Sequence, residues 1–157
     1  MKVIEGDLLE LAEENKFDVI IHGCNCFNKM RSGIANQIRK KYPEAEETDS
    51  ITKKGDINKL GKFSLIRTSD KGGKRVVINA YTQYKWWDKI STKPTLVDYD
   101  AVRMVFREVY NMYGGTCIKI GYPKIGAGLA GGDWDIISKI IDEELGDMDH
   151  TLVEYKK

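Results

Sequence analysis

Residues 117–134 read CIKIGYPKIGAGLAGGDW. The apolar run Cys117–Tyr122 predicts a strand, and the loop after it holds four glycines in seven positions. Asp133 can cap a helix and Gly146 can end one, so we predict a helix between them. Its core-facing positions recur every three or four residues: Trp134, Ile137, Ile141 and Leu145. A strand, a glycine loop and a helix in this order form a unit of an α/β domain.

The same alternation extends along the rest of the chain. Five more strands are predicted, at Lys2–Glu5, Asp18–His22, Phe63–Arg67, Val76–Ala80 and Thr151–Tyr155. Apolar stripes at helical spacing predict two more helices, from about Leu96 to Tyr113 and between Gly33 and Pro43. Because several strands are apolar at consecutive positions, both faces of the sheet should be covered. We therefore predict an α/β fold with helices packed on a central sheet.

The other segments connect these elements within one predicted domain, residues 1–157. The polar segment Glu44–Lys62 is interpreted as a surface excursion with room for a short helix and with little functional signal. Ser69–Lys74 predicts a hairpin turn between two strands. The length of 157 residues corresponds to about one domain of about 150 residues, and 41% hydrophobic residues suffice for a core.

Composition limits the class of function. Lys plus Arg number 25 and Asp plus Glu 24, so the formal net charge of +1 lacks the basic excess typical of general nucleic-acid binding. Cys24, Cys26 and Cys117 have the spacing of neither a zinc site nor a disulfide framework. The chain has no signal-type segment and no apolar run approaching about 20 residues. We expect a soluble cytoplasmic protein without a metal, a cofactor or a membrane partner.

Three loops that follow predicted strands are candidate ligand-binding segments. In Gly6-Asp7-Leu8, the Asp7 carboxylate can accept hydrogen bonds from an exocyclic amine or a ribose hydroxyl, and the structural alternative is a turn or a helix cap. In residues 22–35, the helix start at Gly33 offers unpaired amides and partial positive charge to a pyrophosphate. Asn25 in this loop has a donor and an acceptor for a sugar hydroxyl or an attacking water, and a polar loop with a helix cap is the alternative.

The third loop, residues 122–134, has the glycine density that permits successive inward-pointing amides, an arrangement that holds phosphate oxygens. It has no Gly-Lys followed by Ser or Thr, and it does not lie near an opening strand, where the Gly-x-Gly-x-x-Gly fingerprint belongs. A P-loop nucleoside triphosphatase and a Rossmann dehydrogenase are therefore disfavoured. Asp133 and Trp134 also have structural explanations, as a helix cap and a core residue.

Taken together, the three loops resemble those of macrodomains, which bind ADP-ribose between two such loops. The resemblance spans roughly Lys2 to Tyr155. It is closest to the subgroup that contains phage and yeast ADP-ribose 1″-phosphate phosphatase-like proteins, terminal ADP-ribose protein glycohydrolase, and antitoxins that remove ADP-ribose from DNA. Its most specific parts are Ile125–Leu129 followed by Gly131–Trp134, and Asn79–Gln83. It implies a three-layer fold with a central mixed sheet of about six strands flanked by helices.

The resemblance also implies a set of ligand contacts. Asp7, in the matched motif with Leu8, contacts the adenine amine. Asn25 faces the distal ribose, and Thr82 and Gln83 border the reactive end of the ligand. The positions that line the diphosphate or close over it and the distal ribose are Gly33, Ile34, Ala35, Pro123, Gly126, Ala127, Gly128 and Leu129.

Two departures from the family pattern bear on catalysis. Gln83 stands where the glycohydrolase and antitoxin relatives have a lysine, and a neutral amide cannot form a Schiff-type adduct with an opened ribose. Ala130 stands where the glycohydrolase has an acidic residue. Our leading hypothesis is therefore a phosphatase that converts ADP-ribose 1″-phosphate to ADP-ribose and phosphate. Asn25 and Gln83 lie at the reacting end, and His22 and Asp133 are the candidates for proton transfer.

Two other functions stay open. One is a hydrolase that removes ADP-ribose from a modified protein or nucleic acid, against which the missing lysine counts. The other is a non-catalytic module that binds or sequesters ADP-ribose, against which the lack of another domain to direct counts. A nucleic acid is expected as a partner only when it carries ADP-ribose.

The histidines and two adjacent tryptophans have structural alternatives. His22 ends an apolar strand, which is typical of a buried, hydrogen-bonded histidine, whereas His150 is expected to be exposed. Trp86 and Trp87 cannot both face one core layer, so at least one should be exposed or cover the ligand. Loop packing or stacking on a base of an ADP-ribosylated nucleic acid would each account for the pair.

Overall fold

The computed structural model describes residues 1–86 and 95–156, and within them six strands form one sheet in the order β1-β6-β5-β2-β4-β3. Neighbouring strands pair in parallel except β3, which is antiparallel to β4. The strands are β1 Lys2–Gly6, β2 Val19–Cys24, β3 Phe63–Asp70, β4 Gly73–Tyr81, β5 Lys119–Tyr122 and β6 Asp149–Tyr155. The prediction of a mixed sheet is confirmed.

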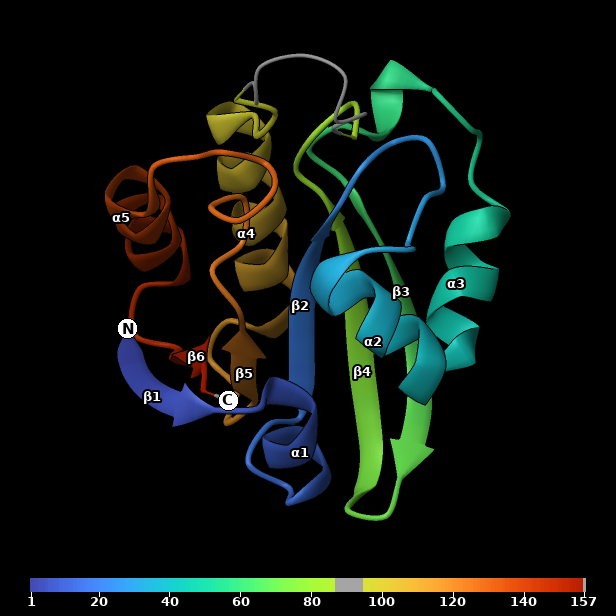
Figure 1. Cartoon of the computed structure of the whole chain (residues 1–157). Helices are drawn as coiled ribbons and strands as arrows, with labels where there is room; N and C mark the ends of the chain where they lie inside the picture. Colours follow the sequence, from blue (N-terminus) through green and yellow to red (C-terminus); the bar gives the residue numbers. More distant parts are fainter. Residues whose placement is uncertain (87–94, 157) are drawn as a thin grey trace.

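Helices cover both faces of this sheet (Figure 1). They are α1 Leu8–Glu13, α2 Gly33–Lys41, α3 Pro43–Ser50, α4 Tyr99–Tyr113 and α5 Trp134–Leu145, with a 3₁₀ turn at Ile57–Lys59. One apolar core, which includes Phe106 and Ile141, lies between the sheet and the pair α4 and α5. A second, which includes Ala12 and Ile38, lies under α1, α2 and α3. The molecule therefore has the predicted three layers.

Capping side chains set where the helices begin. Asp133 accepts a hydrogen bond from the Asp135 amide at 2.9 Å, so α5 starts at Trp134 as predicted. Helix α4 starts at Tyr99 rather than near Leu96, because Asp98 caps the Ala101 amide. The Leu96 amide instead donates to the carbonyl of Ala130 at 2.7 Å, which ties the entry of α4 to the glycine loop.

The segment from Glu44 to Lys62 corrects the sequence interpretation. It holds the expected short helix, α3, but it is more than a surface excursion. Ala45 and Asp49 are buried, and the Asp49 carboxylate accepts a hydrogen bond from the Tyr81 hydroxyl at 2.8 Å. Lys59 is buried as well. The sequence concealed this packing because the buried positions are small or charged and form no apolar stripe.

The connections around β2 form a switch point at the carboxyl ends of the central strands. Strand β2 pairs with β4 on one side and with β5 on the other, all three in parallel. The chain leaves β2 toward α2 on one face and leaves β5 toward α5 on the opposite face (Figure 1). Ligands of open α/β sheets bind at such a switch point, outside the carboxyl ends of the strands.

Candidate functional site

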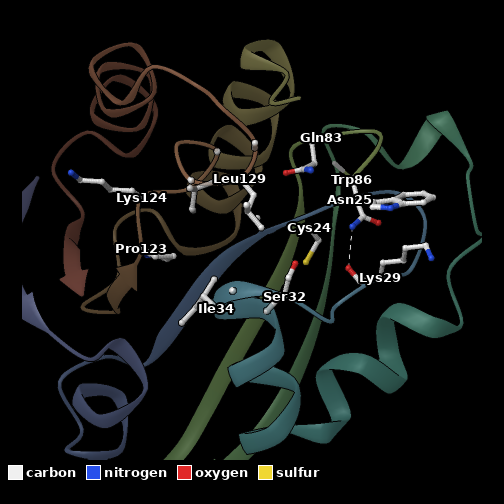
Figure 2. A pocket seen from close by; sticks show the side chains of 17 residues that line it. Cys24, Asn25, Lys29, Ser32, Ile34, Gln83, Trp86, Pro123, Lys124 and Leu129 are labelled. Carbon is white, nitrogen blue, oxygen red and sulfur yellow. Dashed lines mark hydrogen bonds between the residues drawn. The ribbon is translucent and has the colours of Figure 1, made fainter. Parts of the chain in front are cut away.

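A pocket of about 360 Å³ occupies the switch point (Figure 2). Its wall comes from the loops that follow β2, β4 and β5 and from the start of α2. The lining residues are Gly23, Cys24, Asn25, Lys29, Ser32, Gly33, Ile34, Ala35, Gln83, Trp86, Pro123, Lys124, Ile125, Gly126, Gly128, Leu129 and Ala130. Two of the three loops singled out in the sequence thus face one cavity, whose volume suits a small-molecule ligand.

A second hollow of about 510 Å³ continues from this pocket. The two hollows share five lining residues: Gly33, Ile34, Pro123, Lys124 and Gly128. Beyond them the second hollow is lined by Gln37, Ala127, Val153, Glu154 and Tyr155. The start of α2 and the glycine loop therefore form a waist between two cavities, a shape that fits an elongated ligand with a narrow centre.

The start of α2 presents backbone donors to the waist. The N-cap residue Ser32 makes no side-chain hydrogen bond to the helix, so it leaves the first amides uncapped. Within residues 1–86 and 95–156, the amides of Gly33, Ile34 and Ala35 have no acceptor. Gly33 has φ of 58° and nothing within 4 Å of the place of a Cβ. An anion can approach these amides closely, and the positive end of the helix dipole favours it.

The glycine loop presents donors from the opposite side. The Gly132 amide donates to the Gly126 carbonyl at 2.7 Å and closes the loop. Gly126 has φ of 75°, and a Cβ there would lie 2.5 Å from the Val97 side chain, so the turn requires glycine. The amides of Gly126, Leu129 and Ala130 donate to no described residue. Uncapped amides therefore line the first pocket from two sides.

The charged side chains that the structure describes in the first pocket are cationic. Among residues 1–86 and 95–156, its lining includes Lys29 and Lys124 and no Asp, Glu or His. Lys124 lies 3.6 Å from the Glu154 carboxylate at the edge of the second hollow. A chain with a net charge of only +1 therefore has a pocket that favours an anion. In the described residues no group of three or more His, Cys, Asp or Glu side chains is arranged to hold a metal ion.

Asn25 lines the pocket and also shapes its loop. Its Oδ1 accepts a hydrogen bond from the Phe27 amide at 2.9 Å, and its Nδ2 donates to the Lys29 carbonyl at 3.0 Å. The residue is 8% exposed. One proton on Nδ2 and one lone pair on Oδ1 are left to reach a ligand.

Gln83 is a polar side chain that the loop after β4 contributes to the pocket wall (Figure 2). Its Nε2 donates to the Lys85 carbonyl at 2.7 Å. Thr82, which precedes it, is buried beneath the wall, and its hydroxyl has no hydrogen-bond partner among the described residues. A Cβ on Gly23 would lie 2.9 Å from that hydroxyl oxygen, so a side chain at Gly23 would push β2 and β4 apart.

Besides Thr82 and His22, four sequence candidates lie outside the wall of the first pocket. The Asp133 carboxylate caps α5, and Ala127 lines the second hollow. Asp7 caps α1 through one oxygen, which accepts from the amides of Leu9 and Glu10. Leu8 is buried in the core beneath α1.

His22 belongs to the core and does not line the pocket. Its Nε2 lies 2.7 Å from Asn79 Oδ1. The Asn79 amide nitrogen donates to the Ala45 carbonyl, so its oxygen faces the ring and Nε2 carries the proton. Burial lowers the pKa of His22 to about 4 against the opposing effect of the Asn79 hydrogen bond, which makes the ring neutral at pH 7. The structural alternative for this histidine is the one observed.

His150 corrects a prediction. It is buried rather than exposed, and its Nδ1 lies 2.6 Å from the Tyr122 hydroxyl. Burial also lowers its pKa. Trp87 lies outside the described residues, and Trp86 is 40% exposed at the pocket rim.

Lys29, Lys124 and the buried Lys59 are site features that the sequence analysis missed. Lys29 and Lys124 stand inside the two quoted loops, so their neighbourhood was a usable signal. The role of Lys59 could not be predicted, because this residue lies in the segment interpreted as a surface excursion. Its ammonium donates to the Cys26 carbonyl at 3.0 Å.

Acid should destabilise the fold through His22. Between about pH 6.5 and pH 4 the unfolded chain binds a proton at His22 that the folded chain excludes, so the free energy of unfolding should fall with pH by up to about 3 kcal/mol at pH 4. Urea unfolding at several pH values should show this slope. The variant His22→Gln should show a shallower slope over the same range, and an unchanged slope would contradict the assignment.

Fold and site together define an α/β domain of three layers with an anion-favouring pocket at the switch point of its sheet. The chain belongs to the Macro domain family, whose family model matches residues 21–141. Among the described residues, no helix is long and apolar enough to span a membrane.

Three curated proteins are similar over most of this chain. An uncharacterised 17.5 kDa protein of Enterobacteria phage T4 is 35% identical, with 99% of this chain and 97% of that protein covered. The ADP-ribose 1″-phosphate phosphatase of Saccharomyces cerevisiae is 24% identical, with 96% of each covered. The DNA ADP-ribosyl glycohydrolase of Mycobacterium tuberculosis is 27% identical over 94% of this chain, which spans only 40% of that protein.

Solved structures show the same fold. A protein from Bacteroides thetaiotaomicron matches with a TM-score of 0.76 and 25% identity over 98% of this chain and 99% of that one. The macrodomain of Thermus aquaticus DarG matches with a TM-score of 0.72 and 16% identity over 99% and 97%. Thermosipho africanus DarTG, solved in complex with ADP-ribose, matches with a TM-score of 0.73 and 14% identity over 98% of this chain and 42% of that one.

Proposed function

We propose that this chain binds ADP-ribose and removes the phosphate from ADP-ribose 1″-phosphate. The observation that carries the binding is the first pocket, where uncapped amides of α2 and of the glycine loop line the cavity from two sides. Each charge-assisted hydrogen bond from such an amide to a phosphate oxygen contributes about 1.5–3 kcal/mol. Among the residues that the structure describes, no carboxylate lines the first pocket to repel the anion.

The two hollows orient the ligand in this proposal. With the diphosphate at the waist, the adenosine lies in the hollow beside Tyr155, and the distal ribose lies beside Asn25 and Gln83. Asp7 directly follows Gly6, which pairs with Tyr155 in the sheet. Its second carboxylate oxygen, which does not cap α1, is the proposed acceptor for the adenine amine.

In the proposed reaction, water attacks phosphorus and the bond from phosphorus to the ribose oxygen breaks, giving ADP-ribose and inorganic phosphate. The backbone amides of the loops and the Lys29 ammonium would offset the phosphoryl charge. The side-chain amides of Asn25 and Gln83 would orient the ribose or the water. We assign no proton transfer to His22 or Asp133, because neither lines the pocket. The yeast relative supports this reaction by its name and by similarity over nearly all of both chains.

Removal of ADP-ribose from a macromolecule is the second candidate. Similarity to the mycobacterial glycohydrolase favours it, and the lack of a lysine at Gln83 and of any carboxylate in the described wall disfavours it. A non-catalytic module that only binds ADP-ribose would be consistent with the same pocket.

One set of assays separates these functions. Calorimetry with ADP-ribose comes first, and folded protein that fails to bind would end every version of the proposal. The protein is then incubated with ADP-ribose 1″-phosphate, an ADP-ribosylated protein and ADP-ribosylated DNA. We expect phosphate release from the first and no ADP-ribose release from the others. ADP-ribose release would favour the second candidate, and binding without turnover would leave a binding module.

A further inference from the structure

Three loops interlock beside the pocket, and together they form a surface that we call the three-loop face: residues 25–29, 52–59 and 83–86. The Gly55 amide donates to the Cys26 carbonyl at 2.7 Å, and the Cys26 amide donates to the Tyr84 carbonyl at 3.0 Å. Asn28 Nδ2 donates to the Thr52 carbonyl at 3.0 Å. Segments far apart in sequence are thus joined at one corner of the molecule (Figure 1).

Lys59 stiffens this face from below. Its buried ammonium donates to the Cys26 carbonyl at 3.0 Å and to Asn28 Oδ1 at 2.7 Å, and it lies 4.9 Å from the centre of the Tyr81 ring. A buried cation held by two acceptors and an aromatic face fixes the loop that it touches. The face is therefore preformed.

The outer side of the three-loop face is basic. Its exposed lysines are Lys29, Lys53, Lys54 and Lys85. None of them forms an ion pair with a residue that the structure describes, whereas arginines elsewhere pair with carboxylates, as Arg103 and Arg107 do with Glu144. The one acidic residue in the three loops is Asp56, whose carboxylate caps the Asn58 amide. The net charge of +1 hides this local excess because the rest of the chain has slightly more acidic than basic residues.

An aromatic platform lies within this basic surface. The Trp86 ring is held edge-on against Phe27, with centroids 5.3 Å apart, and Phe27 packs against Tyr84 at 4.9 Å. The Lys29 ammonium lies 4.5 Å from the centre of the indole. Figure 2 shows both side chains at the rim of the pocket. An indole that is 40% exposed and fixed by neighbours can accept a stacked ring with little loss of entropy.

We propose that the three-loop face binds single-stranded nucleic acid. Unpaired lysines would contact successive phosphates, and the Trp86 indole would stack on a base, which is the combination used by proteins that bind single strands. Because Lys29 has no carboxylate partner among residues 1–86 and 95–156, its ammonium can pass from the indole to a phosphate when a base stacks on the ring. An acidic peptide would match the charge but would leave the indole unused. This binding goes beyond the small-molecule reaction and does not require it.

Fluorescence anisotropy with labelled single strands of about ten deoxythymidines or ten uridines tests the proposal. At low salt the wild-type protein should bind with a dissociation constant between about 1 and 100 µM. The variant Lys53→Gln/Lys54→Gln should bind about 5- to 10-fold more weakly, and its slope of log affinity against log salt should be shallower by about 1.4. The affinity of Trp86→Ala for the strand should be about tenfold lower than that of the wild type, and Trp86→Phe should recover part of that loss.

The matched control is Lys71→Gln/Lys74→Gln. These exposed lysines flank the hairpin at the far end of β3 and β4, and they too lack ion-pair partners in the described chain. The same loss of charge there should leave strand binding unchanged. No binding by wild-type protein, or an equal loss in both double variants, would overturn the proposal. So would polyglutamate competing as well as a strand. Calorimetry with ADP-ribose on the same preparations reports the proposed function separately.

Discussion

Valine in place of Gly128 should weaken ADP-ribose binding by about 100-fold without unfolding the protein. Gly128 lines both hollows at the waist, and a Cβ built there meets no heavy atom within 4 Å. Its φ is not in the left-handed region, so a side chain costs the backbone little. The added methyl groups would stand where the diphosphate belongs. Loss of about two charge-assisted hydrogen bonds corresponds to about 3 kcal/mol, or about 100-fold in affinity.

Calorimetry and thermal unfolding of Gly128→Val measure the two effects separately. The control is Gly115→Ala, at a glycine with φ of 79° and open space, remote from both hollows. It should lose about 1–2 kcal/mol of stability and keep wild-type affinity. Wild-type affinity in Gly128→Val would place the ligand elsewhere.

Methionine in place of Arg75 should destabilise the fold by about 3–5 kcal/mol. The Arg75 side chain is fully buried, and its Nη2 lies 2.9 Å from Asp70 Oδ1. Its Nη1 donates to the Phe17 carbonyl at 2.6 Å. Burial raises the pKa of Asp70, but the hydrogen bonds from Arg75 and Tyr42 outweigh it and lower the pKa to about 2. Methionine would leave that carboxylate buried with its charge uncompensated.

Urea unfolding of a double-mutant cycle tests this assignment. Asp70→Asn combined with Arg75→Met should recover part of the stability, because no buried charge is then left alone. In the wild type, the lowered pKa of Asp70 contributes stability that is present above about pH 4 and lost as the pH falls toward 2. The loss of stability at low pH should be smaller in Arg75→Met than in the wild type. Additive effects of the two substitutions would show that the pair is not coupled.

Local patterns predicted the elements that carry their own signals. Helix α5 has both its cap and its stop in the sequence, at Asp133 and Gly146, and its bounds agree with the prediction. The turn between β3 and β4 pairs Asp70 with Gly73, as the glycines in that segment indicated. Both features depend on contacts between residues close in the chain, so sequence reveals them.

Elements whose environment comes from distant segments were harder to predict. His150 is buried because β6 pairs it with Ile120 of β5, which brings the Tyr122 hydroxyl to its ring. Helix α3 packs on the sheet through Asp49, which accepts a hydrogen bond from Tyr81, 32 positions further along the chain. The sequence favoured a buried, hydrogen-bonded His22 over a role in proton transfer, but only the register of β2 and β4 shows that its partner is Asn79.

The sequence by itself determined the α/β class, the glycine loop and the helix start that face the cavity, because glycine dihedrals and capping preferences act over a few residues. Only the tertiary structure decided which side chains share the cavity. Parallel strand pairing across dozens of residues brought Lys29, Gln83 and Lys124 to one pocket and left His22 beneath it. Register and burial are properties of the packed sheet, and no local pattern encodes them.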